Sequence, residues 1–177
     1  MSLNTMGYAA PADEAAMSKE YQVKAVFLFN FAMFVEWPAS AFAEVSSPIR
    51  IGILGADSFA KTVERYIEGG TVRDRKLVAV VCHRIEDAKD CQILFVSRTA
   101  QARIAEILAA CGSAPVLLVG ESEGFAARGG VINFFIKDNK VKFEIYPDAA
   151  QRRGIRISSE LLKLARIVNS ENEKEHP

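Results

Sequence analysis

Few side chains in this sequence are of the types that carry out chemistry, and their spacing matches no common catalytic or metal-binding motif. Of the two histidines, His83 follows an apolar stretch that predicts a strand, and His176 lies in a polar C-terminal segment. One internal histidine cannot form a histidine-based metal site, and neither H-E-x-x-H nor C-x-x-C spacing occurs. We therefore predict that the protein binds no metal and no other cofactor.

The segment GILGAD, residues 52–57, places two glycines between an apolar stretch and a helical pattern. A phosphate could bind at such a position, on the N-terminus of the helix. The segment lacks G-x-G-x-x-G spacing and the lysine of a P-loop, and Asp57 would repel a phosphate. A tight strand-to-helix turn is therefore the favoured interpretation.

Other candidate catalytic groups also lack partners. Ser97 follows the apolar run ILFV, as a nucleophile could, but no G-x-S-x-G elbow surrounds it, and His83 is poorly suited as its base. Two pairs of carboxylates could act as general acid and base, namely Glu20 with Glu36 and Asp87 with Asp90. Nothing in the sequence brings either pair into one pocket. We predict that the protein is not an enzyme.

Aromatic side chains offer a binding surface instead. Trp37 is the only tryptophan; it ends an aromatic-rich segment beside a proline, and Phe42 follows. Aromatic residues anchor many protein–protein interfaces, although a core position is the alternative. We predict that Phe34, Trp37 and Phe42 contribute to the surface that contacts a partner or a second copy of the chain.

The charge and hydropathy narrow the range of partners. The 22 Lys and Arg residues balance 22 Asp and Glu residues, so the chain lacks the basic surplus typical of nucleic-acid binding. A local basic cluster, Arg152, Arg153 and Arg156, could meet an acidic partner or ligand, although solvated exposure is the alternative. The apolar stretch 25–35 contains Asn30 and is shorter than the about 20 residues that cross a bilayer. We expect a soluble protein that does not span a membrane.

The elements that position these residues alternate between helical and strand patterns. The spacing of apolar residues predicts helices over about 19–36, 57–67, 99–110 and 158–168. Short apolar runs predict strands at 49–54, 77–81, 93–96, 116–119, 131–136 and 141–145. The last two strands are joined by Lys137 to Lys140, which suits a tight hairpin turn.

This alternation predicts an α/β layered sandwich. We expect a mostly parallel mixed sheet of about six strands, with helices on both faces and a C-terminal antiparallel hairpin. The length of 177 residues fits one domain, which we place at residues 17–169. Residues 1–16 are predicted to be a tag remnant and disordered lead-in, and residues 170–177 a polar tail.

Four segments in a fixed order resemble the YfiR-like family, long catalogued as a domain of unknown function. They are EYQVKAVFLFNFAMFVEWP, PIRIGILGADSF, CQILFVS, and GGVINFFIKDNKVKFEI followed by GIRISSELLKLARIV, and together they cover about residues 20–168. The resemblance implies an α/β fold without catalysis. It also implies a periplasmic repressor that binds the periplasmic region of an inner-membrane diguanylate cyclase and so lowers cyclic-di-GMP signalling. In this family an OmpA-like outer-membrane lipoprotein relieves the repression.

The resemblance has consequences for processing and for the cysteines. It implies an exported protein whose signal peptide, encoded upstream of about Tyr8, has been removed. Cys91 matches the cysteine of the family motif C-x-ILF-S, but the usual partner cysteine is absent from the strand at 49–54. Cys82 is the substitute partner, so we expect a Cys82–Cys91 disulfide with Cys111 free in an oxidising compartment. Tyr146-Pro147 replaces the Asn that usually follows FEI.

Two functions from different classes therefore compete. The first is the regulatory protein that acts by protein contact, either as a monomer or as a homodimer. The second is a periplasmic small-molecule-binding protein or enzyme that uses the C-terminal edge of the sheet, where open α/β sheets usually bind ligands. The lack of a nucleophile–base pair, a metal cluster or a complete phosphate loop favours the first.

Overall fold

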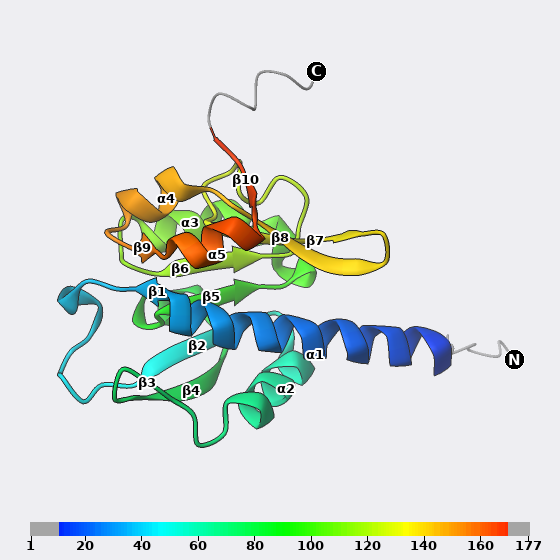
Figure 1. Cartoon of the computed structure of the whole chain (residues 1–177), viewed down its shortest axis with the longest axis horizontal. Helices are drawn as coiled ribbons and strands as arrows, with labels where there is room; N and C mark the ends of the chain where they lie inside the picture. The colour runs from blue at the N-terminus through cyan, green and yellow to red at the C-terminus, as the bar shows by residue number, and fades with distance from the viewer. Residues whose placement is uncertain (1–10, 170–177) are drawn as a thin grey trace, which may run out of the picture.

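A computed structural model describes residues 11–169 and contains one large mixed sheet (Figure 1). The strand order is β10-β8-β7-β6-β5-β2-β4-β3. The strands are β2 (Ile49–Leu54), β3 (Thr71–Val72), β4 (Arg75–Cys82), β5 (Ile93–Val96), β6 (Leu117–Gly120), β7 (Ile132–Lys137), β8 (Lys140–Ile145) and β10 (Arg166–Ile167). A separate two-stranded pair joins β1 (Val35–Glu36) to β9 (Arg156–Ile157). The six predicted strands and the C-terminal hairpin are confirmed.

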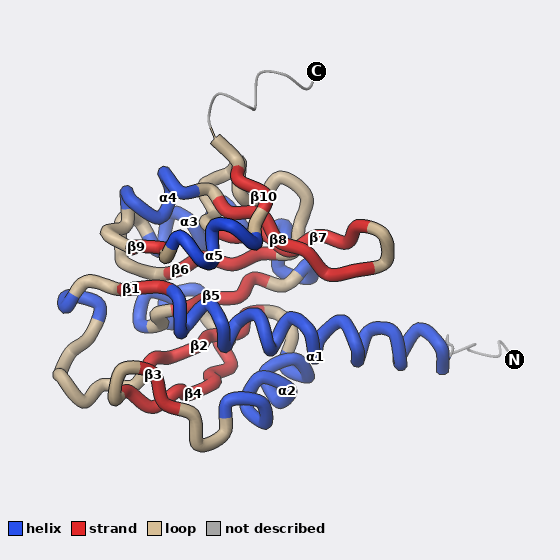
Figure 2. Tube along the Cα trace, in the orientation of Figure 1, coloured by secondary structure: helices blue, strands red, loops and turns tan. Residues whose placement is uncertain are grey.

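The parallel strands place helices on opposite faces of the sheet. The helices are α1 (Pro11–Phe34), α2 (Asp57–Ile67), α3 (Ile104–Cys111), α4 (Pro147–Arg152) and α5 (Ser159–Leu164), with short 3₁₀ turns η1 (Ala39–Ala41), η2 (Ile85–Asp90) and η3 (Arg98–Arg103). From β2 the chain moves through α2 to β4, whereas from β5 it moves through α3 to β6, in the opposite direction across the sheet. Right-handed crossovers therefore put α2 on one face and α3 on the other. Figures 1 and 2 show α1 lying beside α2.

The hairpin turn and the first strand-to-helix turn follow from their residue types. Asp138 and Asn139, between β7 and β8, have φ of 51° and 60°, which these two residue types tolerate well. Gly55, in GILGAD, has φ of 87°, and a Cβ there would lie 2.4 Å from the Ser97 hydroxyl oxygen. This segment is the tight turn expected, and a side chain at Gly55 would collide with Ser97.

Several elements differ from the sequence predictions. The helix expected at 99–110 is divided into η3 and α3, and the short strands β1, β3, β9 and β10 were not predicted. α1 begins at Pro11, inside the expected lead-in, because proline is well suited to the first turn of a helix. The last helix ends at Leu164, and Leu164 is 71% exposed rather than in the core, because the next residues form β10 beside β8. The α4 helix was not predicted, since only Pro147 marks its start. Residues 1–10 of the predicted tag and lead-in (1–16), and the predicted tail at 170–177, lie outside the described residues.

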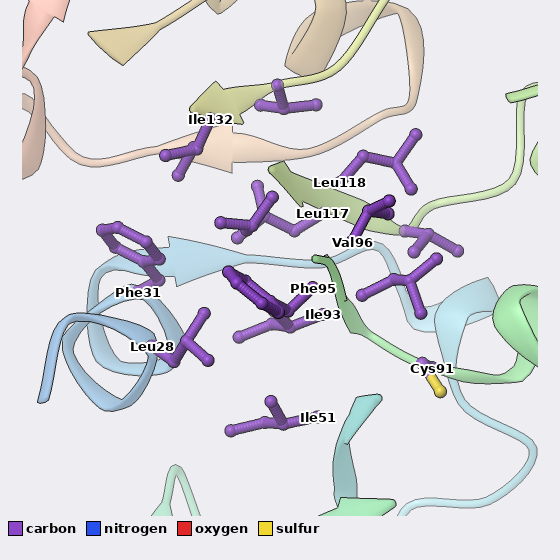
Figure 3. Close-up of a cluster of buried hydrophobic side chains, with 14 of the residues drawn as sticks. Leu28, Phe31, Ile51, Cys91, Ile93, Phe95, Val96, Leu117, Leu118 and Ile132 are labelled. Atoms are coloured by element: carbon purple, nitrogen blue, oxygen red, sulfur yellow. The ribbon is translucent and has the colours of Figure 1, made fainter. Parts of the chain in front are cut away.

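The core joins α1 to the sheet through aromatic rings. The Phe31 ring centroid lies 5.8 Å from that of Phe134 and 5.2 Å from that of Phe143, in the β7–β8 hairpin. Phe59 of α2 lies 4.8 Å from Phe95 of β5 on the same face. Figure 3 shows Leu28 and Phe31 pointing from the helix towards Phe95. α1 is therefore an integral layer of the fold.

Candidate functional site

Trp37 is half-buried and holds the chain after α1 against the sheet. Its indole Nε1 donates a hydrogen bond to the Gln92 carbonyl oxygen at 3.0 Å. The Gln92 side chain in turn donates to the Ala41 carbonyl at 2.7 Å and accepts from the Arg50 amide at 2.7 Å. This network could not be predicted from the sequence, because Gln92 lies far from Trp37 along the chain.

Phe34 and Phe42 are half-buried too, and they do not form one exposed cluster with Trp37. The guanidinium of Arg75 covers the Phe42 ring at 3.6 Å and donates to the Ser47 carbonyl at 2.6 Å. Phe34 instead lines a shallow cleft with Arg156. Of the predicted partner surface, only Phe34 and Arg156 are brought together in this cleft.

The three arginines are divided among different sites. Arg153 is 9% exposed and donates to the Ala114 carbonyl at 3.1 Å, and burial lowers its pKa. Arg152 lies 5.8 Å from the Tyr146 ring, and Arg156 lies opposite Glu36 in the β1–β9 pair. Arg152 and Arg153 both line a cleft of about 260 Å³ together with Arg128, whereas Arg156 belongs to β9 and lines the cleft beside Phe34.

The shallow cleft lies where α1 meets β9, and we call it the helix-end cleft. Its volume is about 180 Å³, and it is lined by Met33, Phe34, Glu36, Arg73, Arg156, Ile157 and Ser158. Met33 is 44% exposed there. Arg73 donates to the Val35 carbonyl at 2.9 Å and lies 3.5 Å from the Glu36 carboxylate. The cleft thus combines an exposed apolar side chain with two arginines and one glutamate.

A larger cavity of about 430 Å³, which we call the edge cavity, opens where β6 ends and β7 continues. Its wall holds Lys24, a buried residue of α1 whose ammonium forms ion pairs with Glu20 and, at 2.6 Å, with Glu121. The Glu121 carboxylate also accepts a hydrogen bond from the Arg98 amide at 2.9 Å. Sequence reasoning considered Glu20 but missed Lys24, although their spacing of four residues on a mostly apolar helix was a usable signal.

Asn133 gives the edge cavity an unused hydrogen-bond acceptor. Its side chain is 4% exposed, and its Nδ2 donates to Glu144 at 3.4 Å. Its Oδ1 has no partner among the described residues, which is uncommon for a buried polar atom. Glu144 also accepts from Arg166 at 3.0 Å, and Arg166 stacks 4.2 Å above Phe135. Asn133 thus lines the cavity with a buried oxygen whose hydrogen-bonding capacity is not used among the described residues.

The remaining catalytic candidates are not assembled into a site. The Ser97 hydroxyl lies 2.7 Å from that of Thr99, which donates to the Gly55 carbonyl at 2.6 Å. Glu20 pairs with Lys24, and Asp87 pairs with Arg84 at 2.9 Å. In residues 11–169 no group of three or more His, Cys, Asp and Glu side chains could hold a metal ion. No described helix is both long enough and apolar enough to cross a membrane.

Cys82 and Cys91 face each other across β2, which separates β4 from β5. Their sulfur atoms are 3.9 Å apart in the thiol form. A Cβ on Gly52 would lie 2.7 Å from the sulfur of Cys91 and 2.9 Å from that of Cys82, so the glycine makes room for both. The hydrogen bond between the thiols lowers the pKa of Cys82, and the same bond together with burial raises the pKa of Cys91.

We predict that oxidised glutathione converts these two thiols to a Cys82–Cys91 disulfide. The disulfide should stabilise the fold by about 2–3 kcal/mol in the chain-entropy model, since the loop is short. Cys111 is buried, and burial raises its pKa, so it should remain a free thiol. Peptide mapping under non-reducing conditions checks the pairing. Recovery of Cys82 and Cys91 as separately alkylated peptides, or of a bridge to Cys111, would contradict it.

Comparison with known proteins identifies the family to which this fold belongs. The fold is that of an open α/β sandwich whose polar groups gather in an edge cavity and a helix-end cleft. Within that class, the model of the YfiR/HmsC-like family matches residues 21–166, and the chain belongs to this family. The family consists of regulatory domains of the periplasm. The resemblance seen in the four sequence segments is therefore confirmed.

One solved structure supports the fold, and the fold alone. A crystal structure of a conserved domain protein from Vibrio cholerae has a TM-score of 0.52 at 14% identity, covering 69% of this chain and 55% of that chain. This chain therefore spans about 55% of the length of the Vibrio protein. An ABC domain from Streptococcus pneumonia in complex with L-Trp gives a TM-score of 0.48 at 12% identity, covering 67% of this chain and 55% of that chain. No curated protein matches the sequence.

Proposed function

We propose that this protein acts in the periplasm as a repressor of an inner-membrane diguanylate cyclase, by binding the periplasmic region of that enzyme. Repression would lower cyclic-di-GMP, and an OmpA-like outer-membrane lipoprotein would relieve it by competing for the repressor. The observation that carries this proposal is membership of the YfiR/HmsC-like family over residues 21–166. The action proposed is protein contact rather than catalysis.

We place the cyclase contact at the helix-end cleft. Met33 offers exposed apolar area, and Arg73 and Arg156 flank it with positive charge. Apolar residues ringed by arginines are typical of the energetically important part of an interface. Trp37 supports this surface from within through its bond to Gln92, so its replacement would change the fold and the binding together.

Replacing the exposed residues Met33 and Arg156 therefore tests the cyclase contact more directly than replacing Trp37. Met33→Glu combined with Arg156→Glu should weaken binding to the purified periplasmic region of the cyclase at least about tenfold. The melting temperature should stay close to that of the wild type, because Met33 is 44% exposed and Arg156 is exposed too. In cells, the same variant should raise cyclic-di-GMP. Calorimetric titration and nucleotide quantification give the two measurements.

Met17→Glu is the matched control, because Met17 is 55% exposed on the opposite end of the same helix. It should bind the cyclase as the wild type does. If both variants weakened binding to the cyclase equally, the contact would lie outside the helix-end cleft. Unchanged cyclic-di-GMP after deletion of the gene would contradict the repressor function itself.

Small-molecule binding in the edge cavity is the second candidate, and the unpartnered Asn133 Oδ1 is the observation that favours it. A ligand there would present an N–H or O–H donor to this oxygen. The cavity lies beyond the carboxyl end of β6, the side on which open parallel sheets usually bind ligands. A metabolite that raises the melting temperature of the wild type but not of Asn133→Leu would support this function.

A further inference from the structure

Another cleft lies between the end of α3 and the helix α4, which lie at the same end of the molecule in Figure 1. Its volume is about 260 Å³, and it shares no lining residue with the helix-end cleft or the edge cavity. Three arginines line it: Arg128 from the loop before β7, Arg152 from the last turn of α4, and Arg153 directly after α4. We call it the arginine cleft.

The positive charge of the arginine cleft is not balanced. None of its lining residues is an aspartate or a glutamate. The ion pairs found within residues 11–169 use other cations, so no carboxylate there pairs with any of the three arginines. Three guanidinium groups in one small cleft repel one another, and this costs free energy unless an anion binds between them.

Arg153 is the member of the cleft that most clearly needs an anion, because it is a buried cation. Its side chain is 9% exposed, and its Nη1 donates to the Ala114 carbonyl at 3.1 Å. Its Nε and Nη2 form no hydrogen bond within residues 11–169. Buried charges in proteins are ordinarily paired with an opposite charge. Burial lowers the pKa of Arg153, and the charge of Arg152 lowers it further, and a bound anion would oppose both effects.

The other two arginines also have hydrogen-bond donors to spare. Arg128 donates through Nε to the Gly124 carbonyl at 3.4 Å and through Nη2 to the Glu123 carbonyl at 3.1 Å, which holds the side chain in place and leaves Nη1 unused. Arg152 lies 5.8 Å from the Tyr146 ring centroid. A guanidinium carries five N–H donors in a planar fork that matches the oxygen atoms of a phosphate. The cleft can therefore donate hydrogen bonds to one anion from three sides.

We propose that the arginine cleft binds a phosphate group, either as inorganic phosphate or as part of a small phosphate monoester. A phosphate gathers its charge on oxygen atoms around one centre, where three guanidinium groups can reach it together. The two charges of a dicarboxylate are further apart. Gly112 and Gly129 leave room in the wall of the cleft, and the apolar Leu108 beside them would contact the organic part of a monoester.

Calorimetric titration of the protein with inorganic phosphate at constant ionic strength tests the proposal. Arg152→Gln should raise the dissociation constant at least about tenfold, because it removes charge-assisted hydrogen bonds. Arg128→Gln should have a similar effect, and both residues are exposed, so the core stays intact. Arg156→Gln is the matched control, because it removes the same charge from an exposed residue outside the cleft. Its dissociation constant should stay within about twofold of the wild type.

Thermal unfolding distinguishes the two sources of the phosphate group, since a ligand of the folded state raises the melting temperature. A larger increase with glycerol 3-phosphate than with inorganic phosphate would identify a monoester, and an equal increase would identify free phosphate as sufficient. Either increase should be lost in Arg152→Gln and kept in Arg156→Gln.

Three results would overturn the proposal. The first is neither binding heat nor a change in melting temperature up to about 20 mM of either phosphate compound. The second is an increase that Arg152→Gln retains in full, which would be a general effect of the salt. The third is an equal increase with succinate, which would contradict the assignment to a phosphate. None of these measurements involves the cyclase, so the outcome is independent of the repressor function.

Discussion

Replacing Lys24 with methionine should lower the melting temperature by about 6–15 °C, because it leaves a buried carboxylate without its counter-charge. The Glu121 side chain is 7% exposed, and its nearest cation is the Lys24 ammonium at 2.6 Å. Breaking one side of such a pair typically costs about 3–5 kcal/mol. Methionine has nearly the same length as lysine, so little of the loss should come from packing. Thermal unfolding followed by circular dichroism measures the shift.

Two further variants isolate the cause. Lys19→Met changes an exposed lysine on the same helix and should leave the melting temperature nearly unchanged. Lys24→Met combined with Glu121→Gln removes both charges and should recover much of the lost stability, while glutamine still accepts from the Arg98 amide. A double variant no more stable than Lys24→Met alone would show that the ion pair is not the source.

Phe31→Ala should destabilise the fold by about 3–5 kcal/mol, the usual cost of deleting a fully buried aromatic ring. Phe31 is 0% exposed and lies between Phe134 and Phe143 of the hairpin. Its loss should loosen α1 from the sheet, so amides along the second half of α1 should exchange faster. Urea unfolding and hydrogen exchange measure both effects.

Met33→Ala on the same helix is the comparison, because Met33 is exposed and makes no part of the core. It should cost less than about 1 kcal/mol. A similar loss for both variants would mean that α1 contributes through helix propensity rather than through its buried face.

The elements that the sequence predicts well are those whose pattern is local. The strands β2, β5 and β6 are continuous apolar runs bounded by turn residues, and the Asp138-Asn139 turn carries its own conformational signal. The ends of the helices α1 and α5 were predicted less well from the sequence. Leu164 fits a helical stripe, yet it is exposed because β8 offers its backbone edge to the residues that follow. Such competition between local pattern and strand pairing depends on the tertiary fold.

The candidate sites combine residues from segments that are distant in the sequence. The sequence grouped Phe34 with its neighbours Trp37 and Phe42, whereas the helix-end cleft brings Phe34 together with Arg73 from the β3–β4 turn and Arg156 from β9. The partner of Lys24 is Glu121, which follows β6. The residues around Lys24 and around Glu121 in the sequence do not predict this ion pair. Similarly, Gly52 reads as a turn glycine, whereas its role beneath the two cysteine sulfurs follows from the order β4-β2-β5.

The contact between α1 and the β7–β8 hairpin also constrains how the chain reaches its native state. Phe31 packs against Phe134 and Phe143, which are among the last core residues to be synthesised. Contacts between such distant residues carry a loop-closure entropy cost and slow folding. A nascent chain can bring α1 against α2 early, but it cannot complete the buried face of α1 until the hairpin has been made.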